Sequence, residues 1–528
     1  MKTTNLIDRN HLQSAILALT FTIFALTILT QANPGTELPS RDYGSYIYAA
    51  KEIIQGKLLY KDVWDSKPPA IFYINVLALK IGRGSRWGVW LLEYMFLYCS
   101  ILASYQLIKK LWGVAPALFG MMIWLLGLNH VLQGGNFTEE YPLVFHFISL
   151  IIFLKLLENP QERFYYFLLG VMFSLSFLFR PNNAIVEVTT IFVLIMIRVL
   201  QRDFRALLIS TSMLAAGILI PVLITAGYFW SMGLLPDLLE ASILYNFSYG
   251  TTQMSSSLPL IGGFQYLNFS AWVALIGYVL LVFRLRKSFG SPAFYILVIL
   301  LIGSPLAIYL SDPAKRNYGH YFINWLPFIA LLSGFAWHFL QSELSNLLKD
   351  IQFPSMLPFV VALIASGIYF FVNGSGWQYE NAVQRVLNGP SAEARSPISI
   401  YVENHTRPGE YVLFWATLPG ENFMSHRNAP YSSLFYPSFV ESSISDRLAD
   451  DFLQDITTTP PVLVVDMGRL EPLSLNPQKR AEQRSMGIGW PYPPKNLEAV
   501  FSFIEKNYYL EAQVKGKNIY RLYGTTQP

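Results

Sequence analysis

The sequence has little charge. Asp, Glu, Lys and Arg together make up only 14% of its 528 residues, whereas soluble domains average about 25%. A chain so poor in charged side chains cannot cover a water-exposed surface along its whole length. Charge returns to an ordinary density only after Val372. These proportions exclude a soluble cytoplasmic enzyme and predict a polytopic membrane portion followed by a polar C-terminal domain.

Other common signatures are scarce as well. Cysteine occurs once, at Cys99, which excludes an internal disulfide, a cysteine zinc site and a redox pair of thiols. The net charge of +4 is too small to favour nucleic acid as a partner. The C-terminal portion has no glycine-rich phosphate loop, no HExxH or GxSxG motif and no His/Cys cluster with metal spacing. No nucleotide-binding or hydrolase signature is therefore present there.

Long apolar runs fill most of the first 372 residues. About eleven of them are long enough, or nearly so, to cross a bilayer, so the sequence predicts a mainly α polytopic membrane protein. Because no small-x-small cleavage site follows the first run, we expect an uncleaved helix with a cytoplasmic N-terminus. The predicted spans are Ser14–Thr30, Trp87–Ile108, Ala115–Leu132, Tyr141–Leu157, Phe164–Phe179, Ala184–Leu200, Ala206–Phe229, Asn268–Phe283, Ala293–Leu310, Phe322–Leu340 and Met356–Val372.

The basic residues support one orientation of these spans. Short loops assigned to the cytoplasm hold most of the Lys and Arg, as the positive-inside rule requires, and short external loops hold only Arg180, Lys315 and Arg316. The exception is the first external stretch, residues 31–86, where basic and acidic residues are mixed. A loop of this kind is typical of a folded, functional segment. An odd number of spans places the C-terminal domain outside the cytoplasm.

The polar C-terminal part combines strand and helix signals. Tyr411–Ala416 and Pro461–Asp466 are short apolar runs typical of buried strands. Tyr508–Val514 and Asn518–Tyr523 flank a Lys-Gly-Lys turn and predict a hairpin, and Ser396–Asn404 predicts a helix. We therefore expect two domains, a membrane domain over residues 1–372 and a small extracytoplasmic α/β domain, accessory in role, over residues 373–528.

The first external loop carries the strongest candidate chemistry. A short helix is predicted from Tyr43 to Gln55, and an apolar helix lying along the membrane face from Ala70 to Ile81. Asp42, at the mouth of the first helix, could act as a general base; its alternative role is a helix cap, shared with Ser40. Lys67, before two prolines, could hold a phosphate leaving group; its alternative is a solvated cation whose stem follows the membrane surface.

Two further clusters lie on the same outer side. Glu139 and Glu140 precede a span, where acidic side chains complement a helix dipole; of the two, we expect Glu139 to orient the acceptor or bind a cation together with Asp42. Arg180 opens another external loop, and a third external loop, Ser311–Tyr321, holds further basic and aromatic residues. These cations and aromatic side chains could hold a phosphate headgroup, or could anchor the chain at the interface: Lys315, Arg316, His320 and Tyr321.

These residues carry a resemblance. The pattern Asp42-x-Gly-x-Tyr, Gly56, Tyr60-x-Asp62 and Lys67-Pro-Pro resembles the first loop of the GT-C membrane glycosyltransferases. The closest similarity is to family 39, which includes protein O-mannosyltransferases, lipid A aminoarabinose transferases and many bacterial relatives. The Asn136-Phe-Thr-Glu and Gly319-His-Tyr segments fit the same layout.

The resemblance implies an activity. Members transfer a sugar with inversion from a polyprenyl-phosphate donor, outside the cytoplasm. Asp42 matches their essential acid and Lys67 their phosphate-contacting lysine, and we add Asp62 and Asp65 as substrate contacts. Aminoarabinose transferases have a metal-associated glutamate just before the lysine, where this chain has Ser66 and a carboxylate one residue earlier. The resemblance requires no cofactor with certainty, and it leaves a divalent metal ion as a possible cofactor.

The resemblance also implies partners and a location. We expect a bacterial inner-membrane enzyme that meets the lipid bilayer, a polyprenyl-phosphate sugar and a glycan, lipid or protein acceptor, and no nucleic acid. The alternatives are a transporter or flippase of lipid-linked glycans, and a polymerase or ligase of such glycans. A transporter would place charged residues near mid-membrane and often show a repeated half, whereas the polar clusters here gather on one side.

Overall fold

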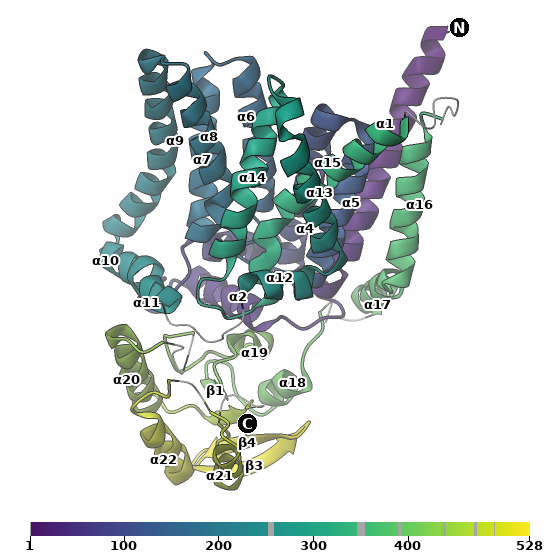
Figure 1. Cartoon of the computed structure of the whole chain (residues 1–528). Coiled ribbons are helices and arrows are strands. Elements are labelled where there is room, and N and C mark those ends of the chain that lie inside the picture. Colours follow the sequence, from purple (N-terminus) through teal and green to yellow (C-terminus); the bar gives the residue numbers. More distant parts are fainter. Residues whose placement is uncertain are drawn as a thin grey trace. The chain divides into compact units, whose positions relative to one another are not determined.

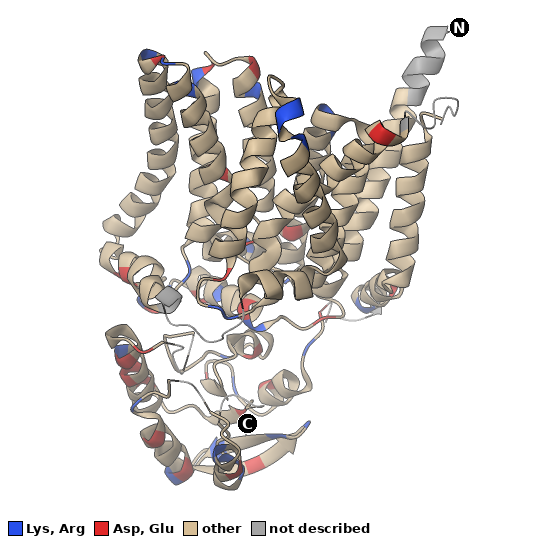
Figure 2. Cartoon of the chain, viewed as in Figure 1, with Lys and Arg blue, Asp and Glu red and all other residues tan. Residues whose placement is uncertain are grey.

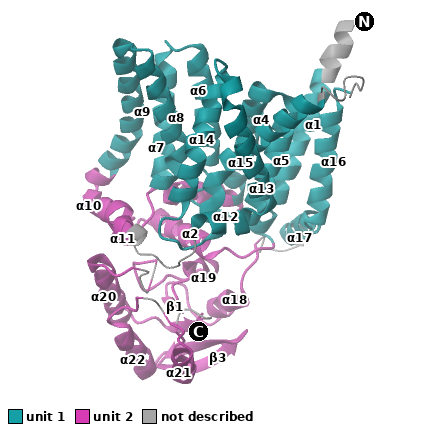
Figure 3. Cartoon of the chain, viewed as in Figure 1, with its two compact units in different colours: residues 1–35, 90–228, 253–388 teal, residues 36–89, 229–252, 389–528 magenta. Residues whose placement is uncertain are grey.

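The computed structural model describes residues 2–251, 258–345, 354–388, 393–434, 436, 440–468, 473–489 and 492–527. Its contacts divide the chain into two compact units (Figure 3). Unit 1 comprises Met1–Gly35, Trp90–Tyr228 and Gln253–Asn388, and unit 2 comprises Thr36–Val89, Phe229–Thr252 and Gly389–Pro528. The domain boundary expected after residue 372 stays a prediction; in this division by contacts, the first loop groups with the C-terminal part.

Unit 1 is a bundle of helices (Figure 1). A helix is found at each of the eleven predicted spans, and shorter helices and 3-10 turns join them. The elements lying wholly or mostly in unit 1 are α1 (Lys2–Ile28), η1 (Leu29–Ala32), α4 (Trp87–Trp112), α5 (Val114–Val131), α6 (Leu143–Glu158), α7 (Arg163–Phe179), η2 (Pro181–Ala184), α8 (Ile185–Leu200), α9 (Phe204–Ser231), α12 (Pro259–Leu267), α13 (Phe269–Arg284), η4 (Leu285–Ser288), α14 (Pro292–Ser311), η5 (Gly319–Trp325), α15 (Leu326–Ser345), α16 (Leu357–Val372) and α17 (Ser375–Asn388).

Their composition suits a bilayer. Among the described residues, eight helices are long and apolar enough to cross a membrane, or nine if α16 and α17, bent by 64°, form one span. The predicted count of eleven is therefore not confirmed, whereas a multi-pass membrane protein is. Figure 2 shows little charge along the middle of these helices. On α9, large apolar side chains such as Leu208, Leu223 and Ile224 are exposed, as lipid-facing positions allow.

Small residues bring the helices of unit 1 close together. A Cβ added at Gly120 of α5 would lie 2.4 Å from the carbonyl oxygen of Ala330 in α15. Between α7 and α9, a Cβ at Gly170 would lie 2.3 Å from the carbonyl oxygen of Leu214. Such close backbone approach is how membrane helices gain packing energy where the hydrophobic effect is absent.

Unit 2 contains a four-stranded sheet in the order β1-β2-β4-β3. β1 pairs with β2 in parallel, with Val412 opposite Leu463, and β4 pairs antiparallel with both β2 and β3. The core of the sheet is apolar and includes Phe414, Val465 and Ile519. All four strands and the hairpin turn agree with the sequence prediction: β1 (Val412–Trp415), β2 (Leu463–Asp466), β3 (Tyr508–Val514) and β4 (Lys517–Leu522).

Helices complete unit 2. The predicted helix before β1 is α18, capped by the Ser396 hydroxyl, which accepts a hydrogen bond from the Ser399 amide at 2.9 Å. The helices of unit 2 are α2 (Arg41–Ile54), α3 (Ala70–Ile81), α10 (Leu235–Leu239), η3 (Glu240–Leu244), α11 (Tyr245–Thr251), α18 (Pro397–Asn404), α19 (Pro419–Met424), α20 (Ser443–Thr458), α21 (Pro477–Ser485) and α22 (Leu497–Asn507).

The first loop packs on the C-terminal part through two glycines. A Cβ added at Gly44 of α2 would lie 2.7 Å from the Cα of Gly420 in α19, so the two backbones touch. Nearby, the Tyr48 hydroxyl accepts a hydrogen bond from the Ala429 amide at 2.8 Å. Helix α2 and the C-terminal residues therefore form one folded body.

Candidate active site

The carboxylate of Asp65 fixes Lys67 in the first loop. Its Oδ1 accepts a hydrogen bond from the Lys67 amide at 3.0 Å and lies 3.6 Å from the Lys67 ammonium. The Tyr60 hydroxyl donates a hydrogen bond to the Lys67 carbonyl at 2.8 Å. Because Pro68 and Pro69 then lead into α3, the backbone of Lys67 is held on both sides. This arrangement presents the ammonium group at a defined position.

Asp65 itself is fully buried. Burial raises the pKa of its carboxyl, the Lys67 cation opposes that rise, and the negative charge of Asp42 adds to it. Asp42 therefore lies close enough to interact with Asp65. Its carboxylate sits in the first turn of α2, where a helix dipole favours negative charge. We call Asp42, Asp65 and Lys67 the first-loop cluster.

The remaining predicted carboxylate of this loop has a local role. The exposed Asp62 accepts a hydrogen bond at Oδ2 from the Leu58 amide at 2.8 Å, and so closes a turn. Ser40, one of two predicted caps of α2, occupies the N-cap position, whereas Asp42 lies inside the helix.

Neighbouring segments of unit 2 anchor the loop from two sides. Trp64 exchanges backbone hydrogen bonds with the C-terminal part, donating to Ser432 and accepting from Leu434, each at 3.0 Å. The Asn246 amide of α11 donates to the Ser66 carbonyl at 2.7 Å. The position of Lys67 therefore depends on segments far away in the sequence.

Unit 1 contains a second polar cluster. Glu139 is fully buried; Arg180 donates to its Oε1, and the Thr138 hydroxyl donates to its Oε2 at 2.8 Å. The Arg180 guanidinium lies over the ring of Tyr321, 4.3 Å from its centroid, in a cation–π contact. His320 stacks on Phe137 at 4.2 Å. We call Glu139, Arg180, His320 and Tyr321 the membrane-unit cluster.

The other predicted cations lie on one loop of unit 1. Asp312 orders this loop, because its carboxylate accepts hydrogen bonds from the amides of Arg316 at 2.8 Å and Asn317 at 2.7 Å. The Arg316 side chain is largely buried, whereas Lys315 is half-buried with a φ of 51°. The loop leads into η5, which carries His320 and Tyr321.

A buried carboxyl pair supports the segment before Glu139. Glu93 Oε1 accepts from the Asn136 amide at 2.6 Å, and Glu140 Oε2 accepts from the Phe137 amide at 3.4 Å. The other oxygen of each group, Glu93 Oε2 and Glu140 Oε1, is buried with no hydrogen-bond partner among the described residues. Gly135 must be glycine here, because its φ is 78° and an added Cβ would lie 2.3 Å from Glu93 Oε1.

The sequence missed several supporting residues. Asn183 donates to the Thr138 carbonyl at 2.8 Å and accepts from Asn324 at 3.2 Å, which ties the loop after α7 to η5. Tyr60 and Phe137 belong to segments that carry the resemblance, but the sequence assigned no contact to either side chain. The sequence signal for Asn183 was its place in the polar Asn182-Asn183 pair, which follows Arg180-Pro181. No short sequence pattern links Asn183 to Thr138.

The structure thus brings together Asp42, Asp65 and Lys67 in unit 2, and Glu139, Arg180, His320 and Tyr321 in unit 1. Within the described ranges, no three side chains of His, Cys, Asp or Glu are grouped so as to hold a metal ion.

The comparisons with known proteins point to one fold. Residues 66–225, beginning one residue before Lys67, match the model of the family described as dolichyl-phosphate-mannose-protein mannosyltransferase. ArnT from Cupriavidus metallidurans, bound to undecaprenyl phosphate, superposes with a TM-score of 0.59 at 13% identity, covering 96% of this chain and 97% of that chain. The chain has the fold of the GT-C membrane glycosyltransferases. No curated protein matches this sequence.

The GT-C fold extends over nearly the whole chain. The apo state of the same ArnT superposes with a TM-score of 0.57 at 11% identity, over 98% of both chains. The predicted fold class, a helical membrane bundle with a small C-terminal α/β part, is confirmed. At this low identity the likeness concerns the fold, so the reaction must be argued from the side chains.

Proposed function

We propose that this GT-C protein transfers a sugar, with inversion, from a polyprenyl-phosphate donor to an acceptor hydroxyl on the extracytoplasmic face of a bacterial inner membrane. The family model matched by residues 66–225 is named for a dolichyl-phosphate sugar, and ArnT of the same fold binds undecaprenyl phosphate. Both names concern a lipid phosphate, which supports a donor of that class.

The side-chain observation that carries the proposal is the first-loop cluster. Asp65 holds the Lys67 ammonium 3.6 Å away, while the carboxylate of Asp42 lies in the same neighbourhood. A fixed cation beside an accessible acid is what a displacement at a sugar phosphate needs: a group that accepts a proton and a group that stabilises the leaving phosphate.

The reaction assigns one task to each residue. Asp42 takes the proton of the acceptor hydroxyl, whose oxygen attacks the anomeric carbon from the side opposite the phosphate. The bond between the anomeric carbon and the phosphate oxygen breaks, and the lipid phosphate leaves with the electron pair. Lys67 stabilises the negative charge that develops on that oxygen. Asp65 is a positioning residue, because it acts on the reaction through Lys67.

The membrane-unit cluster supplies further proposed contacts. Its members Arg180, His320 and Tyr321 remain proposed ligands of the donor's phosphate or sugar, as do Lys315 and Arg316 of the neighbouring loop. Both carboxylate oxygens of the buried Glu139 are engaged, by Arg180 and Thr138. We therefore propose that Glu139 positions Arg180, rather than orienting the acceptor as the sequence led us to expect.

A transfer assay tests the proposal. The full-length protein in nanodiscs is incubated with undecaprenyl-phosphate-linked radiolabelled sugars and membrane glycolipid acceptors, and the products are analysed by mass. We expect Asp42→Asn to lower kcat by about a hundredfold or more, because general base catalysis contributes about 10²–10⁴-fold. Lys67→Met should lower both kcat and the affinity for undecaprenyl phosphate.

Lys61→Met is the matched control, because Lys61 is an exposed lysine six residues earlier in the same loop. Undiminished transfer by Asp42→Asn would remove Asp42 as the base. If the protein moves the glycolipid across the bilayer and forms no new glycosidic bond, it is a transporter and not a transferase.

A further inference from the structure

Unit 2 contains a large pocket outside the first-loop cluster. Its volume is about 790 Å³, within the usual range for ligand sites of about 300–1,000 Å³. The ends of α2 and α3, the turn that follows α3, and two C-terminal segments form its walls. Every lining residue belongs to unit 2. The pocket is therefore a feature of one compact body.

The lining is strongly cationic. Five basic residues line the pocket: Lys51, Lys80, Arg83, Arg395 and His426. The only acidic side chain in the lining is Glu393, and it is already neutralised. Its Oε2 accepts from Arg86 Nε at 2.8 Å, and its Oε1 accepts from the Ser85 hydroxyl at 2.6 Å. Arg86 is buried and does not line the pocket.

The cations are incompletely matched by protein acids. In the part of the chain that the structure describes, neither Lys80 nor Arg83 forms an ion pair, and both are exposed. Arg395 pairs with Glu403, but its Nε is buried with no hydrogen-bond partner among the described residues. A buried guanidinium donor without an acceptor is costly, and an anionic oxygen in the pocket would satisfy it.

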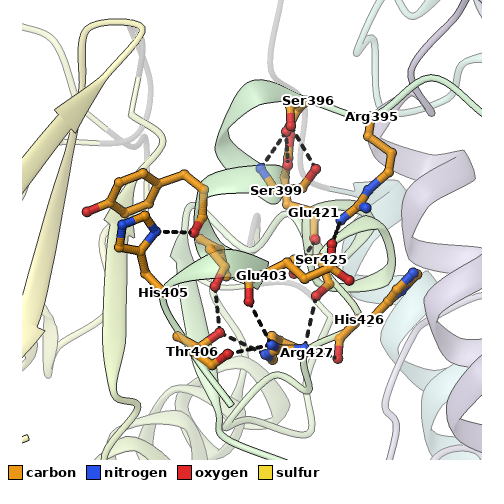
Figure 4. A network of polar contacts seen from close by, with 12 residues as sticks. Arg395, Ser396, Ser399, Glu403, His405, Thr406, Glu421, Ser425, His426 and Arg427 are labelled. Atoms are coloured by element: carbon orange, nitrogen blue, oxygen red, sulfur yellow. Dashed lines mark hydrogen bonds and ion pairs between the residues drawn. The ribbon is translucent and has the colours of Figure 1, made fainter. Parts of the chain in front are cut away.

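His426 lines the pocket and lies next to Arg427 in a network of polar contacts (Figure 4). Its φ of 55° is in the left-handed region, where a residue other than glycine is uncommon. The adjacent Arg427 is fixed by hydrogen bonds to the carbonyls of Glu403 at 2.9 Å and Thr406 at 2.6 Å. The turn is thus ordered independently of any ligand.

The pKa of the His426 imidazole reflects the positive charges around it. Burial lowers the pKa of His426, and the positive charges of Arg395, Lys51 and Arg427 lower it further, against an opposing effect of Glu403. Burial also lowers the pKa of Lys51; the negative charge of Glu52 opposes this, and the positive charges of Lys57 and Arg427 add to it. Cations from α2 and from the C-terminal part therefore act on a common volume.

The chemistry of the walls selects the ligand. Of the four Lys and Arg side chains in the lining, Lys51 pairs with Glu52 and Arg395 with Glu403, so Lys80 and Arg83 are the two without a carboxylate partner among the described residues. A single carboxylate would neutralise only one of these two, whereas a phosphate dianion matches both and offers three acceptor oxygens suited to the Arg fork. Apolar side chains, including Phe423 and Leu79, complete the lining, and an aromatic face can pack on the apolar face of a sugar ring.

We propose that this cationic pocket binds a phosphorylated saccharide. The phosphate follows from the charge of the lining alone, whereas the saccharide, as part of the acceptor, rests on the proposed function. The ligand's phosphate would meet Lys80 and Arg83 at the rim and Arg395 deeper inside. Two sources share this chemistry, a soluble sugar phosphate and the headgroup of a phosphorylated glycolipid.

Titration of the full-length protein in phosphatidylcholine nanodiscs tests the proposal. Glucose 6-phosphate and glucose are compared by calorimetry, and a parallel arm uses nanodiscs that carry a synthetic lipid-linked glucose 6-phosphate. We expect binding of the phosphate forms only, weakened by salt. Binding of the soluble compound assigns a soluble ligand, and binding of the lipid-linked compound alone assigns a headgroup. Binding of neither overturns the proposal.

Variants locate the bound phosphate. Lys80→Gln/Arg83→Gln removes two exposed rim cations and should weaken binding about tenfold or more. Lys479→Gln/Arg407→Gln removes two exposed cations of unit 2 outside the pocket and should leave it unchanged. Equal affinity of the rim variant and the unaltered protein, or loss of binding in Lys67→Met alone, overturns the pocket assignment.

The transfer assay separates this proposal from the proposed function. Sugar transfer without phosphate binding in the pocket rejects only the pocket. Phosphate binding that depends on Lys80 and Arg83, in a protein without transferase activity, upholds the pocket and rejects the transferase.

Discussion

Asp65 and Lys67 are connected twice, through the backbone amide at 3.0 Å and through the side-chain ammonium at 3.6 Å, both at the same carboxylate oxygen. A buried carboxylate therefore fixes the direction of the lysine while it offsets part of its charge. These two effects act in opposite directions on a phosphate ligand, since good orientation helps catalysis and partial neutralisation weakens binding.

The first prediction separates these two effects. Asp65→Asn keeps the size of the side chain but removes its charge, so Lys67 loses its electrostatic partner. We expect kcat to fall about tenfold to a hundredfold, because a misplaced catalytic group is costly. The affinity for undecaprenyl phosphate should not fall, because the cation is less neutralised. Steady-state kinetics and lipid-phosphate binding measure the two quantities.

Asp451→Asn is the control for this experiment, since the Asp451 side chain, in the same unit, is 48% exposed. Equal losses of kcat and of lipid-phosphate affinity in Asp65→Asn would contradict a positioning role.

The second prediction concerns Glu139 and Arg180. Glu139→Gln leaves the guanidinium, which is only 15% exposed, without its carboxylate. Breaking a buried pair from one side typically costs about 3–5 kcal/mol, so we expect a clear loss of thermal stability. The double variant Glu139→Gln/Arg180→Gln should recover part of that loss, because no uncompensated charge remains. Melting curves in detergent measure Glu139→Gln, Arg180→Gln and the double variant.

Additive losses in this cycle would show that the two side chains do not stabilise each other. The ion pair Lys110–Glu158 serves as the comparison, since both of its side chains are well exposed and exposed pairs contribute only about 0–1 kcal/mol.

The sequence predicted local elements well. Helix α3 covers the predicted Ala70–Ile81, because two prolines precede it and Gly82 follows it. The hairpin of β3 and β4 was also recognised, since two alternating runs flank a Lys-Gly-Lys turn. In such cases the chemistry of a few adjacent residues determines where an element begins and ends.

Long-range relationships could not be predicted in this way. The pairing of Glu139 with Arg180 joins residues 41 positions apart, and the packing of Gly44 on Gly420 joins the first loop to the C-terminal part. No periodicity in the sequence encodes either contact. Asp62 and Asp65 looked equivalent as candidates, and only their burial separates the turn-closing carboxylate from the one that holds Lys67.

The third prediction is a pH dependence of stability. Burial raises the pKa of Glu140 well above its ordinary value of 4.5, so the folded protein holds a proton that the unfolded chain releases. This contribution to stability is fully present below pH 4.5 and is lost as the pH rises through the raised pKa. Glu140→Gln should therefore flatten the decline of the melting temperature from about pH 5 to about pH 8. An unchanged slope in Glu140→Gln would contradict the prediction.

The last prediction tests how α2 is seated in unit 2. A Cβ at Gly44 would lie 2.7 Å from the Cα of Gly420, and a Cβ at Gly420 would lie 2.9 Å from the Cα of Gly44. Either alanine forces two backbones apart, at a cost of about 1–3 kcal/mol, and displaces Asp42 on the same helix. We expect lower transfer activity and faster proteolysis in Gly44→Ala and Gly420→Ala, with a less than additive double variant because both act on one contact. Gly489→Ala is the control, because an added Cβ there meets no atom within 4 Å; it should change neither activity nor proteolysis. Additive effects of Gly44→Ala and Gly420→Ala would mean that the two substitutions act at separate contacts.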